Sequence, residues 1–404
     1  MFKYIFTCFI YFILFIGCSE NSNPKGRWYL ELNLQEQRLP FIIEIDGQNG
    51  KTLTGHLINS DEKIPLVGEK IKDLIEFKIE GNYSILRLRI DGDTASGEWV
   101  RTNRENYRVG FTGSKTSQEN IYSKYEKQTN LLNFSGKWKI KLDNGNFGLG
   151  IFKQVGSRIQ GSILTETGDF RFLDGFINNN EVTLTGFDGT FSHIFYLVTG
   201  KEDFNGMQYS GIKYNAKISG TKNESFELSD ANDLTTLKKG ITKLSMSGLV
   251  SIEGKKINFG SGSFKNKAKV VQVFGSWCPN CLDETRFLLK WKRENKKYKD
   301  DVKIIALAFE NFETKAQAIK ALKKYKHELQ VNYPIVLLDS ASTKTVSNYL
   351  PFEKMVAFPT TIFLDKHNHI VKIHTGFSGQ ATGPYFDLFK QEFDMTILKL
   401  FKVK

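Results

Sequence analysis

Alternation of apolar and polar positions dominates the first half of the chain. From residue 26 to about 115, and again from about 134 to 228, short alternating runs are separated by turn signals such as Asp91-Gly92-Asp93 and Asp188-Gly189. A period of two is typical of strands with one buried face. No proline occurs between Pro65 and Pro279, which suits long runs of paired strands. The pattern therefore predicts two all-β units.

The two β units share an ordered set of residues. Gly26-Arg27-Trp28 recurs as Gly136-Lys137-Trp138, and Phe41, Gly50 and Gly55 recur as Phe147, Gly156 and Gly161. We expect barrel- or sandwich-like units, β unit 1 over 26–115 and β unit 2 over 134–230, joined by a polar linker over 116–133 with a helix at 119–127. A single larger barrel made from both copies is an alternative.

A Gly-x-Trp first strand followed by a glycine-bearing hairpin resembles the lipocalin and avidin-like up-and-down barrels. That resemblance implies that Trp28 and Trp138 close one barrel end, and that a small apolar ligand could bind inside. The alternative is that both tryptophans are core aromatics without a ligand pocket.

The pattern changes after Asp230, where a lysine-bearing connector leads to a predicted β-hairpin at 249–257. Buried strands then alternate with amphipathic helices, which is the α/β class. We expect strands at 270–274, 302–309, 335–338, 360–364 and 370–374, and helices at 279–297, 313–328, 343–350 and from 384 onward. Residues 231–404 are thus predicted to be one α/β domain.

The first residues read as a targeting segment. A short basic start, Met1 to Lys3, precedes an apolar run from Tyr4 to Ile16 that is too short for a membrane span. The run ends in Phe15-Ile16-Gly17-Cys18, which resembles the lipobox of bacterial lipoproteins. The resemblance implies a signal peptide over 1–17, lipid on Cys18 and a polar tether over 18–25. An ordinary secretory signal or an uncleaved anchor are the alternatives.

Chain length and composition indicate the number of domains and the charge of the surface. With 404 residues, 40% of them hydrophobic, the chain is long enough for two or three domains. The formal charge of +12 could suggest a nucleic-acid partner, but lysines are mixed with acidic residues throughout and form no basic stripe. We expect a solvated basic surface and no nucleic-acid partner.

The four cysteines narrow the chemistry. Cys8 would leave with the signal peptide and Cys18 would carry lipid, so an exported protein would hold Cys278 and Cys281 alone. In an oxidising compartment these two thiols would react with each other.

The residues around this pair favour disulfide exchange. A buried strand runs straight into Cys278, where a helix is predicted to begin with Pro279 in its first turn. Unpaired N–H groups at a helix start stabilise a thiolate, so Cys278 would be the nucleophile and Cys281, one turn later, the resolving thiol. A zinc site lacks a second ligand pair, and a structural disulfide closing so short a loop would restrain little. Both remain alternatives.

Residues 247–394 resemble the thioredoxin superfamily, and within it the TlpA/ResA-like membrane-anchored thiol-disulfide oxidoreductases. The motifs that carry this resemblance are Phe274-Gly275-Ser276-Trp277-Cys278-Pro279-Asn280-Cys281, Tyr333-Pro334-Ile335-Val336-Leu337-Leu338-Asp339, Ala357-Phe358-Pro359-Thr360-Thr361 and Thr375-Gly376. The resemblance implies a thioredoxin fold with a redox-active disulfide, Cys278–Cys281, and no other cofactor.

The resemblance also assigns roles. Pro359 would be cis, Phe358 would offer its backbone to the substrate chain, and Trp277 and Pro279 would shape the site. Glu284 matches the family's acidic residue three positions after the second cysteine, where it could relay protons to Cys281. Gln272 replaces the buried aspartate of thioredoxin itself, and Asn280 replaces a common Pro or His.

We therefore expect a lipid-anchored protein-disulfide reductase of the cell envelope, facing the periplasm. Its partners would be disulfide-containing exported proteins and a membrane electron donor. An oxidase or isomerase, a binding lipoprotein whose β units carry the function, and a copper-handling chaperone are the alternatives. His367 and His369 lie in a predicted polar turn with His374 beyond, and we expect no metal there.

Overall fold

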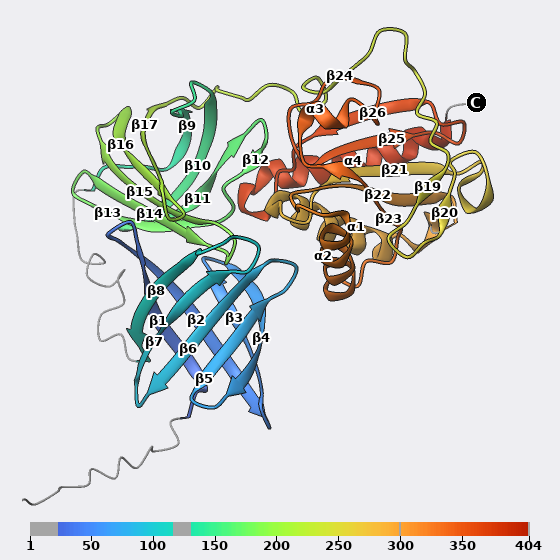
Figure 1. The fold of residues 1–404 in the computed structure, drawn as a ribbon. Coiled ribbons are helices and arrows are strands. Elements are labelled where there is room, and N and C mark those ends of the chain that lie inside the picture. The colour runs from blue at the N-terminus through green and yellow to red at the C-terminus, as the bar shows by residue number, and fades with distance from the viewer. Residues whose placement is uncertain (1–22, 116–130, 299, 403–404) are drawn as a thin grey trace, which may run out of the picture.

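The structure is a computed structural model that describes residues 23–115, 131–298 and 300–402, folded as two β domains and a C-terminal α/β domain (Figure 1). Cys18 and the predicted helix at 119–127 lie outside the described residues. The α/β class of the C-terminal domain and the barrel-like nature of both β units are confirmed.

The first β unit, barrel 1, is a closed antiparallel barrel in which each strand pairs with the next and β8 pairs with β1. Its strands are β1 (Gly26–Leu34), β2 (Gln37–Asn49), β3 (Thr52–Asn59), β4 (Glu62–Ile71), β5 (Leu74–Ile79), β6 (Ser84–Asp91), β7 (Thr94–Arg101) and β8 (Arg108–Ser114). Alternate positions point inward, as in β1, where Trp28, Leu30 and Leu32 are buried.

The second β unit, barrel 2, closes through the pairings of β10 with β11 and of β9 with β17. Its strands are β9 (Gly136–Lys141), β10 (Phe147–Val155), β11 (Arg158–Thr165), β13 (Leu173–Asn178), β14 (Glu181–Phe187), β15 (Ser192–Thr199), β16 (Asp203–Ser210) and β17 (Tyr214–Lys222). The short β12 (Gly168–Asp169) extends β11 as a hairpin outside this ring. Two separate barrels form, so the alternative of a single larger barrel is wrong.

The two barrels start in the same way. The indole Nε1 of Trp28 donates to Pro24 O at 2.8 Å, and that of Trp138 donates to Phe134 O at 3.0 Å. Ile45 pairs with Gly26 on one side and Gly55 on the other, and Phe152 pairs with Gly136 and Gly161 in the same way.

One predicted correspondence between the copies is wrong. Phe41 is buried in barrel 1, whereas Phe147 is 42% exposed. A bulge in β2 between Ile45 and Gly47 adds one residue before the turn, and β10 has no such bulge. Because one extra residue moves a side chain to the opposite face of a strand, equal spacing from the turn does not give equal orientation.

Barrel 2 fills one end of barrel 1. Phe187, at the end of β14, packs its ring 5.1 Å from that of Phe41 and 5.0 Å from that of Trp99. The indole of Trp99 also donates to Gly189 O at 3.0 Å. Together with the fully buried Trp28, these rings occupy the inside of barrel 1. The core-aromatic interpretation of Trp28 therefore describes barrel 1 better than a ligand pocket does.

The C-terminal domain is built on a five-stranded sheet in the order β23-β22-β21-β25-β26. The central strands β21 (Ala268–Phe274) and β22 (Val302–Glu310) are parallel, as are β22 and β23 (Ile335–Ser340). The antiparallel edge consists of β25 (Thr360–Leu364) and β26 (Ile370–Thr375). The predicted hairpin is present as β19 (Leu249–Val250) and β20 (Lys256–Ile257), and β18 (Thr236–Leu237) pairs with β24 (Phe352–Lys354).

Helices cover the sheet because its strands are apolar on both faces. Residues of α1 (Pro279–Glu294), α2 (Lys315–Glu328) and α4 (Pro384–Lys402) share one core cluster with Val270 and Ile304. The opposite face, with Val271 and Ile305, packs against α3 (Thr343–Val346) and the segment that precedes β21. Short 3-10 turns lie at Gly262–Phe264, Lys296–Tyr298 and Gln380–Thr382.

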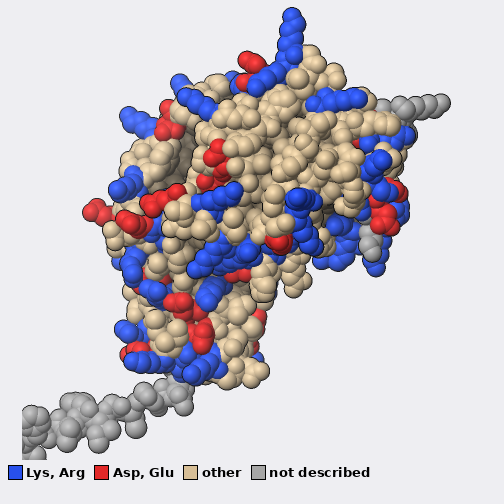
Figure 2. All heavy atoms as spheres, turned by 45° about the vertical axis from the view of Figure 1, so that its right-hand side comes forward, with Lys and Arg blue, Asp and Glu red and all other residues tan. Residues whose placement is uncertain are grey.

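Charges are distributed without a single basic face in view. Figure 2 shows Lys and Arg side chains over all three domains, interspersed with Asp and Glu. Within the described part of the chain, no helix combines the length and apolar character that a membrane span needs.

Candidate active site

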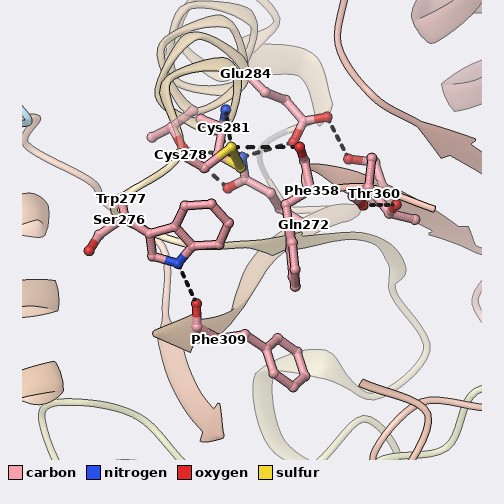
Figure 3. Close-up of a disulfide and its surroundings, with 12 residues drawn as sticks. Gln272, Ser276, Trp277, Cys278, Cys281, Glu284, Phe309, Phe358 and Thr360 are labelled. Carbon is pink, nitrogen blue, oxygen red and sulfur yellow. Dashed lines mark hydrogen bonds between the residues drawn. A yellow bond between two sulfur atoms is a disulfide. The ribbon is translucent and has the colours of Figure 1, made fainter. Parts of the chain in front are cut away.

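Cys278 and Cys281 form a disulfide at the start of α1 (Figure 3). Cys278 is the N-cap residue, and its Sγ accepts from Cys281 N at 3.2 Å. Pro279 is the first helical residue, where a missing N–H leaves no helical hydrogen bond unmade. Cys278 is 7% exposed and Cys281 is fully buried. Of the two cysteines, only Cys278, at the helix N-terminus, retains exposed surface.

The loop before Cys278 is held by the end of β22. The Trp277 indole Nε1 donates to Phe309 O at 3.0 Å, and the ring meets that of Phe358 edge-on at 5.7 Å. Gly275 is required here, since a Cβ at this position would lie 2.2 Å from Trp277 Nε1. The loop thus places a half-exposed aromatic ring beside the disulfide.

The loop at Phe358 and Pro359 faces the same sulfur. The peptide bond between them is cis, as the resemblance implied, and Phe358 O lies 3.6 Å from Cys278 Sγ. Gly376 N donates to Pro359 O at 2.8 Å, which ties this loop to the end of β26. The four predicted site residues Trp277, Pro279, Phe358 and Pro359 therefore surround Cys278.

Glu284 is buried rather than solvated, with 1% of its surface exposed. Its Oε1 accepts from Thr361 Oγ1 at 2.7 Å and its Oε2 from Gln272 Nε2 at 2.9 Å. Burial outweighs these two bonds and raises the pKa of Glu284 to about 7. The carboxyl therefore exchanges a proton near neutral pH, one helical turn after Cys281.

Gln272 connects this carboxyl to the sheet. Besides Glu284, its amide Nε2 donates to Thr285 Oγ1 at 3.1 Å, and Tyr325 OH donates to the same threonine oxygen at 2.9 Å. A residue that does not titrate thus takes a structural place in the network, and Glu284 is the carboxyl of that network.

Residues 230–384 match the family model described as Redoxin. The match coincides with the sheet order and the Cys-x-x-Cys helix start described above. Residues 230–384 are a thioredoxin-like domain.

Among solved structures, a thiol:disulfide interchange protein of the thioredoxin family from Chlorobium tepidum is 20% identical over 38% of this chain and 97% of that chain, with a TM-score of 0.28. The thioredoxin domain of a thiol-disulfide oxidoreductase from Bacteroides vulgatus is 22% identical over 39% and 98%, with a TM-score of 0.28. StoA from Bacillus subtilis is 20% identical over 34% and 91%, with a TM-score of 0.26. No curated protein matches the chain.

A second buried carboxyl in the thioredoxin-like domain escaped the sequence analysis. Glu310, the last residue of β22, is 2% exposed and accepts from Ser276 N at 2.7 Å and from Ser276 Oγ at 2.8 Å. Burial raises the pKa of Glu310 to about 7 despite these bonds. A single Glu at a strand end belongs to no motif. The sequence feature that could have marked Glu310 is a charged residue directly after the apolar run of β22.

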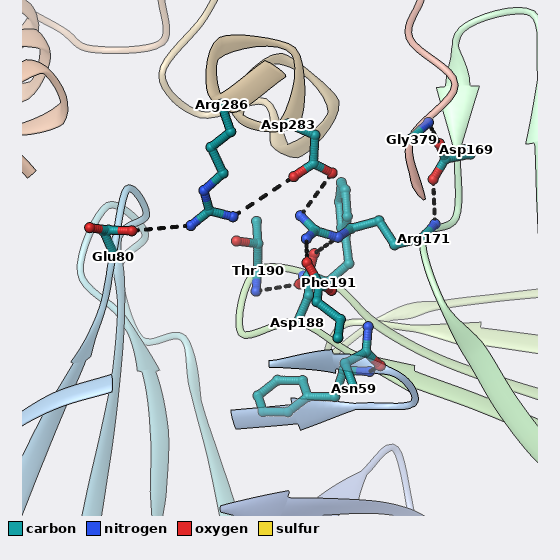
Figure 4. Close-up of polar contacts among 12 residues, drawn as sticks. Asn59, Glu80, Asp169, Arg171, Asp188, Thr190, Phe191, Asp283, Arg286 and Gly379 are labelled. Atoms are coloured by element: carbon teal, nitrogen blue, oxygen red, sulfur yellow. Dashed lines mark hydrogen bonds and ion pairs between the residues drawn. The ribbon is translucent and has the colours of Figure 1, made fainter. Parts of the chain in front are cut away.

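Both barrels touch α1, the helix of the thioredoxin-like domain that begins at the disulfide (hereafter the redox helix). Arg171 of barrel 2 is 7% exposed in its side chain and forms ion pairs with Asp188 of barrel 2 and Asp283 of α1 (Figure 4). It also pairs with Glu62 of barrel 1. Burial opposes the charge of Arg171, but the surrounding carboxylates outweigh it and raise the pKa of the guanidinium. Arg171 therefore joins all three domains. Its partner in α1, Asp283, lies two residues after Cys281.

Asn280, one of the two residues between the cysteines, also meets barrel 2. A Cβ on Gly168, in the hairpin of β12, would lie 1.9 Å from Asn280 Nδ2. Gly168 has φ +142°, which other residues rarely adopt. The barrel backbone therefore lies directly against the Cys-x-x-Cys turn.

The histidine turn does not gather metal ligands. His369 Nδ1 lies 2.9 Å from Asp365 Oδ2, whereas the buried His374 lies 3.3 Å from Asn232 Oδ1, and burial lowers the pKa of His374 to about 4. Among the residues that the structure describes, no group of three or more His, Cys, Asp or Glu has a metal-binding arrangement.

Proposed function

We propose that this protein is a cell-envelope thiol-disulfide oxidoreductase that reduces disulfides of exported proteins through Cys278 and Cys281. The observation that carries the proposal is the position of Cys278 Sγ, at the N-terminus of α1 and 3.6 Å from the Phe358 carbonyl. That position combines thiolate stabilisation with backbone that a substrate chain can approach.

The first step uses the reduced protein. The Cys278 thiolate attacks one sulfur of a substrate disulfide, forming a mixed disulfide and releasing the other substrate sulfur as a thiolate. Trp277 and Phe358 flank this sulfur as partly exposed aromatic side chains and would contact the substrate chain.

The second step uses the buried thiol. Cys281 passes its proton toward Glu284 and attacks Cys278 Sγ, which forms the intramolecular disulfide, breaks the mixed disulfide and releases the second substrate sulfur as a thiolate that takes a proton from water. Two electrons have then moved from the protein to the substrate. A membrane dithiol donor would return Cys278 and Cys281 to the reduced state by the same exchange in reverse.

The cellular location and the direction of electron transfer are part of the proposal. Lipid on Cys18, behind a signal peptide over 1–17, would hold the protein at the membrane with the redox site facing the periplasm. The reducing direction follows from the resemblance to reductases of the TlpA/ResA-like type.

The test is a disulfide-reduction assay on the full chain in detergent, with a measured reduction potential. A potential near that of thioredoxin, at about −270 mV, and activity lost in Cys278→Ser are expected. A potential near −120 mV, the order of a strong oxidant, would reassign the protein to disulfide formation. No exchange by the unmutated chain would remove the enzyme proposal.

A further inference from the structure

One turn of barrel 1 reaches the redox site. This docking turn, residues 80–83 between β5 and β6, lies against α1 and α2 of the thioredoxin-like domain. Gly81 N donates to Glu328 Oε2 at 3.1 Å, and Lys324 Nζ donates to Asn82 O at 3.0 Å. Gly81 has φ +75°, and a Cβ there would lie 2.8 Å from Leu282 Cδ1, the residue after Cys281. The turn therefore packs directly on the redox helix.

Tyr83 extends this contact to the active-site loop. Its ring meets that of Phe312 edge-on at 5.8 Å, and its hydroxyl lies 2.6 Å from Ser276 Oγ. Ser276 is 3% exposed and lies two residues before Cys278. A hydroxyl from the N-terminal half of the chain is thus bonded to the loop that carries the nucleophile.

The direction of the two hydrogen bonds at Ser276 Oγ follows from the number of protons that each partner can donate. A serine hydroxyl has one proton to donate, and Ser276 Oγ lies 2.8 Å from Glu310 Oε2. When Glu310 is ionised it accepts only, so Ser276 donates to it and the Tyr83 hydroxyl must donate to Ser276. The chain Tyr83, Ser276, Glu310 is then continuous across the domain boundary.

We propose that Tyr83 is a positioning residue of the redox site, supplied by barrel 1, which holds the loop of Ser276, Trp277 and Cys278 against the end of β22. The proposal deepens the proposed function, on which it rests for its catalytic consequence. Ser276 N and Trp277 Nε1 already bind the end of β22, to Glu310 and to Phe309 O respectively. Tyr83 adds the hydrogen bond that fixes Ser276 Oγ from the other side.

A tighter loop keeps Cys278 in line with the first amides of α1. Those amides stabilise the thiolate, so a looser loop lowers the average stabilisation and raises the pKa of the Cys278 thiol. Barrel 1 would in this way affect the reactivity of a cysteine that belongs to another domain.

The experiment uses the reduced full chain in detergent, with Tyr83→Phe, Ser276→Ala and the double variant. Thiolate absorbance against pH gives the pKa of Cys278, and an aromatic disulfide reagent gives its rate. In Tyr83→Phe we expect the pKa of Cys278 to rise by about 0.5 unit, the scale of one lost hydrogen bond, and its reaction below that pKa to slow by up to about threefold. Ser276→Ala, which loses the bonds to both Tyr83 and Glu310, should shift the pKa at least as much. The double variant should match Ser276→Ala, since the Tyr83 hydroxyl has lost its partner once the Ser276 hydroxyl is gone.

The control is Phe312→Leu, which weakens the ring contact of the docking turn and leaves the hydroxyl in place. It should keep the wild-type pKa of Cys278. The proposal is overturned if Tyr83→Phe leaves that pKa unchanged, if Phe312→Leu shifts it equally, or if the two single effects add. Because the thiol titration needs no protein substrate, it still tests Tyr83 if the reductase assay fails.

Discussion

Barrel 1 and barrel 2 are built alike but attach to the thioredoxin-like domain by different chemistry. Both begin with a tryptophan bonded to a carbonyl four residues earlier. Barrel 1 attaches through the docking turn, where Tyr83 bonds to Ser276, Glu80 forms a partly exposed ion pair with Arg286, and the charged groups of Glu328 and Lys324 bond to the turn backbone. Barrel 2 attaches through Arg171, a buried cation held by three carboxylates. The strands give the shape, and the turns give each copy its own contacts.

The two attachments should differ in energy. The hydrogen bonds and the partly exposed ion pair of the docking turn are each worth about 1 kcal/mol net. A buried ion cluster adds little net stability when complete, but removing one member leaves uncompensated buried charge. Barrel 2 should therefore be the attachment that is costly to disturb, and barrel 1 the one that adjusts the redox site.

The largest effect is expected for Arg171→Met. The substitution leaves Glu62, Asp188 and Asp283 without their shared cation, so we expect a loss of about 4 to 5 kcal/mol in the free energy of unfolding. Denaturant unfolding of the full chain measures it. Arg89→Met, which breaks an exposed pair with Asp73, is the control and should cost less than about 1 kcal/mol. Equal losses would contradict the difference between the attachments.

The next effect concerns the contact between the barrels themselves. Phe187→Ala leaves a void between Phe41 and Trp99, and we expect a loss of about 3 to 4 kcal/mol in unfolding free energy. Phe147→Ala, at an exposed position of β10, is the matched control and should cost under about 1 kcal/mol. If the two variants unfold alike, barrel 2 does not complete the core of barrel 1.

The pH dependence of stability compares two buried glutamates of the thioredoxin-like domain, Glu310, which is linked to barrel 1, and Glu284, which is not. Burial raises the pKa of both from 4.5 to about 7 in the folded protein. Between these pH values the folded state holds a proton that the unfolded state has lost, so stability falls as pH rises. We expect about 2 to 3 kcal/mol for each carboxyl across this window.

Thermal or denaturant unfolding from pH 4 to pH 8 measures this slope. Glu284→Gln and Glu310→Gln should each flatten it by a similar amount. A slope that neither substitution changes would mean that folding does not raise the pKa of either carboxyl.

The smallest effect concerns the hairpin of barrel 2 against Asn280. Gly168→Ala should cost about 1 kcal/mol more than Gly26→Ala, because both have positive φ but only Gly168 faces a side chain at 1.9 Å. Asn280→Ala should remove that difference, as read from the unfolding free energies. A difference that persists in the Asn280→Ala background would place the strain in the backbone alone.

Local patterns predicted much of this molecule. Alternation located both β units, and the strand running into Cys278 located the redox helix. Both signals lie within about ten residues of sequence, where periodicity and spacing are informative. The loop of Phe358 and Pro359, which lies beside Cys278, was implied by the family resemblance of its motif instead.

Other features depend on contacts between distant segments. Tyr83 lies 193 positions from Ser276, and Arg171 lies 109 positions from Glu62. Neither residue type nor spacing marks them, because their partners are brought together only by the packing of domains. Phe147 shows a different limit, since a bulge in β2 changed the register without leaving a sequence signal.

The filling of barrel 1 by Phe187 has a consequence for the order in which the chain is made. All eight strands of barrel 1 precede residue 115, whereas Phe187 is made more than 70 residues later. A chain that emerges from its N-terminus therefore carries barrel 1 with an open apolar end until β14 has been synthesised. Export or chaperone binding during that interval would protect the open end, and the two barrels would mature as one folding unit.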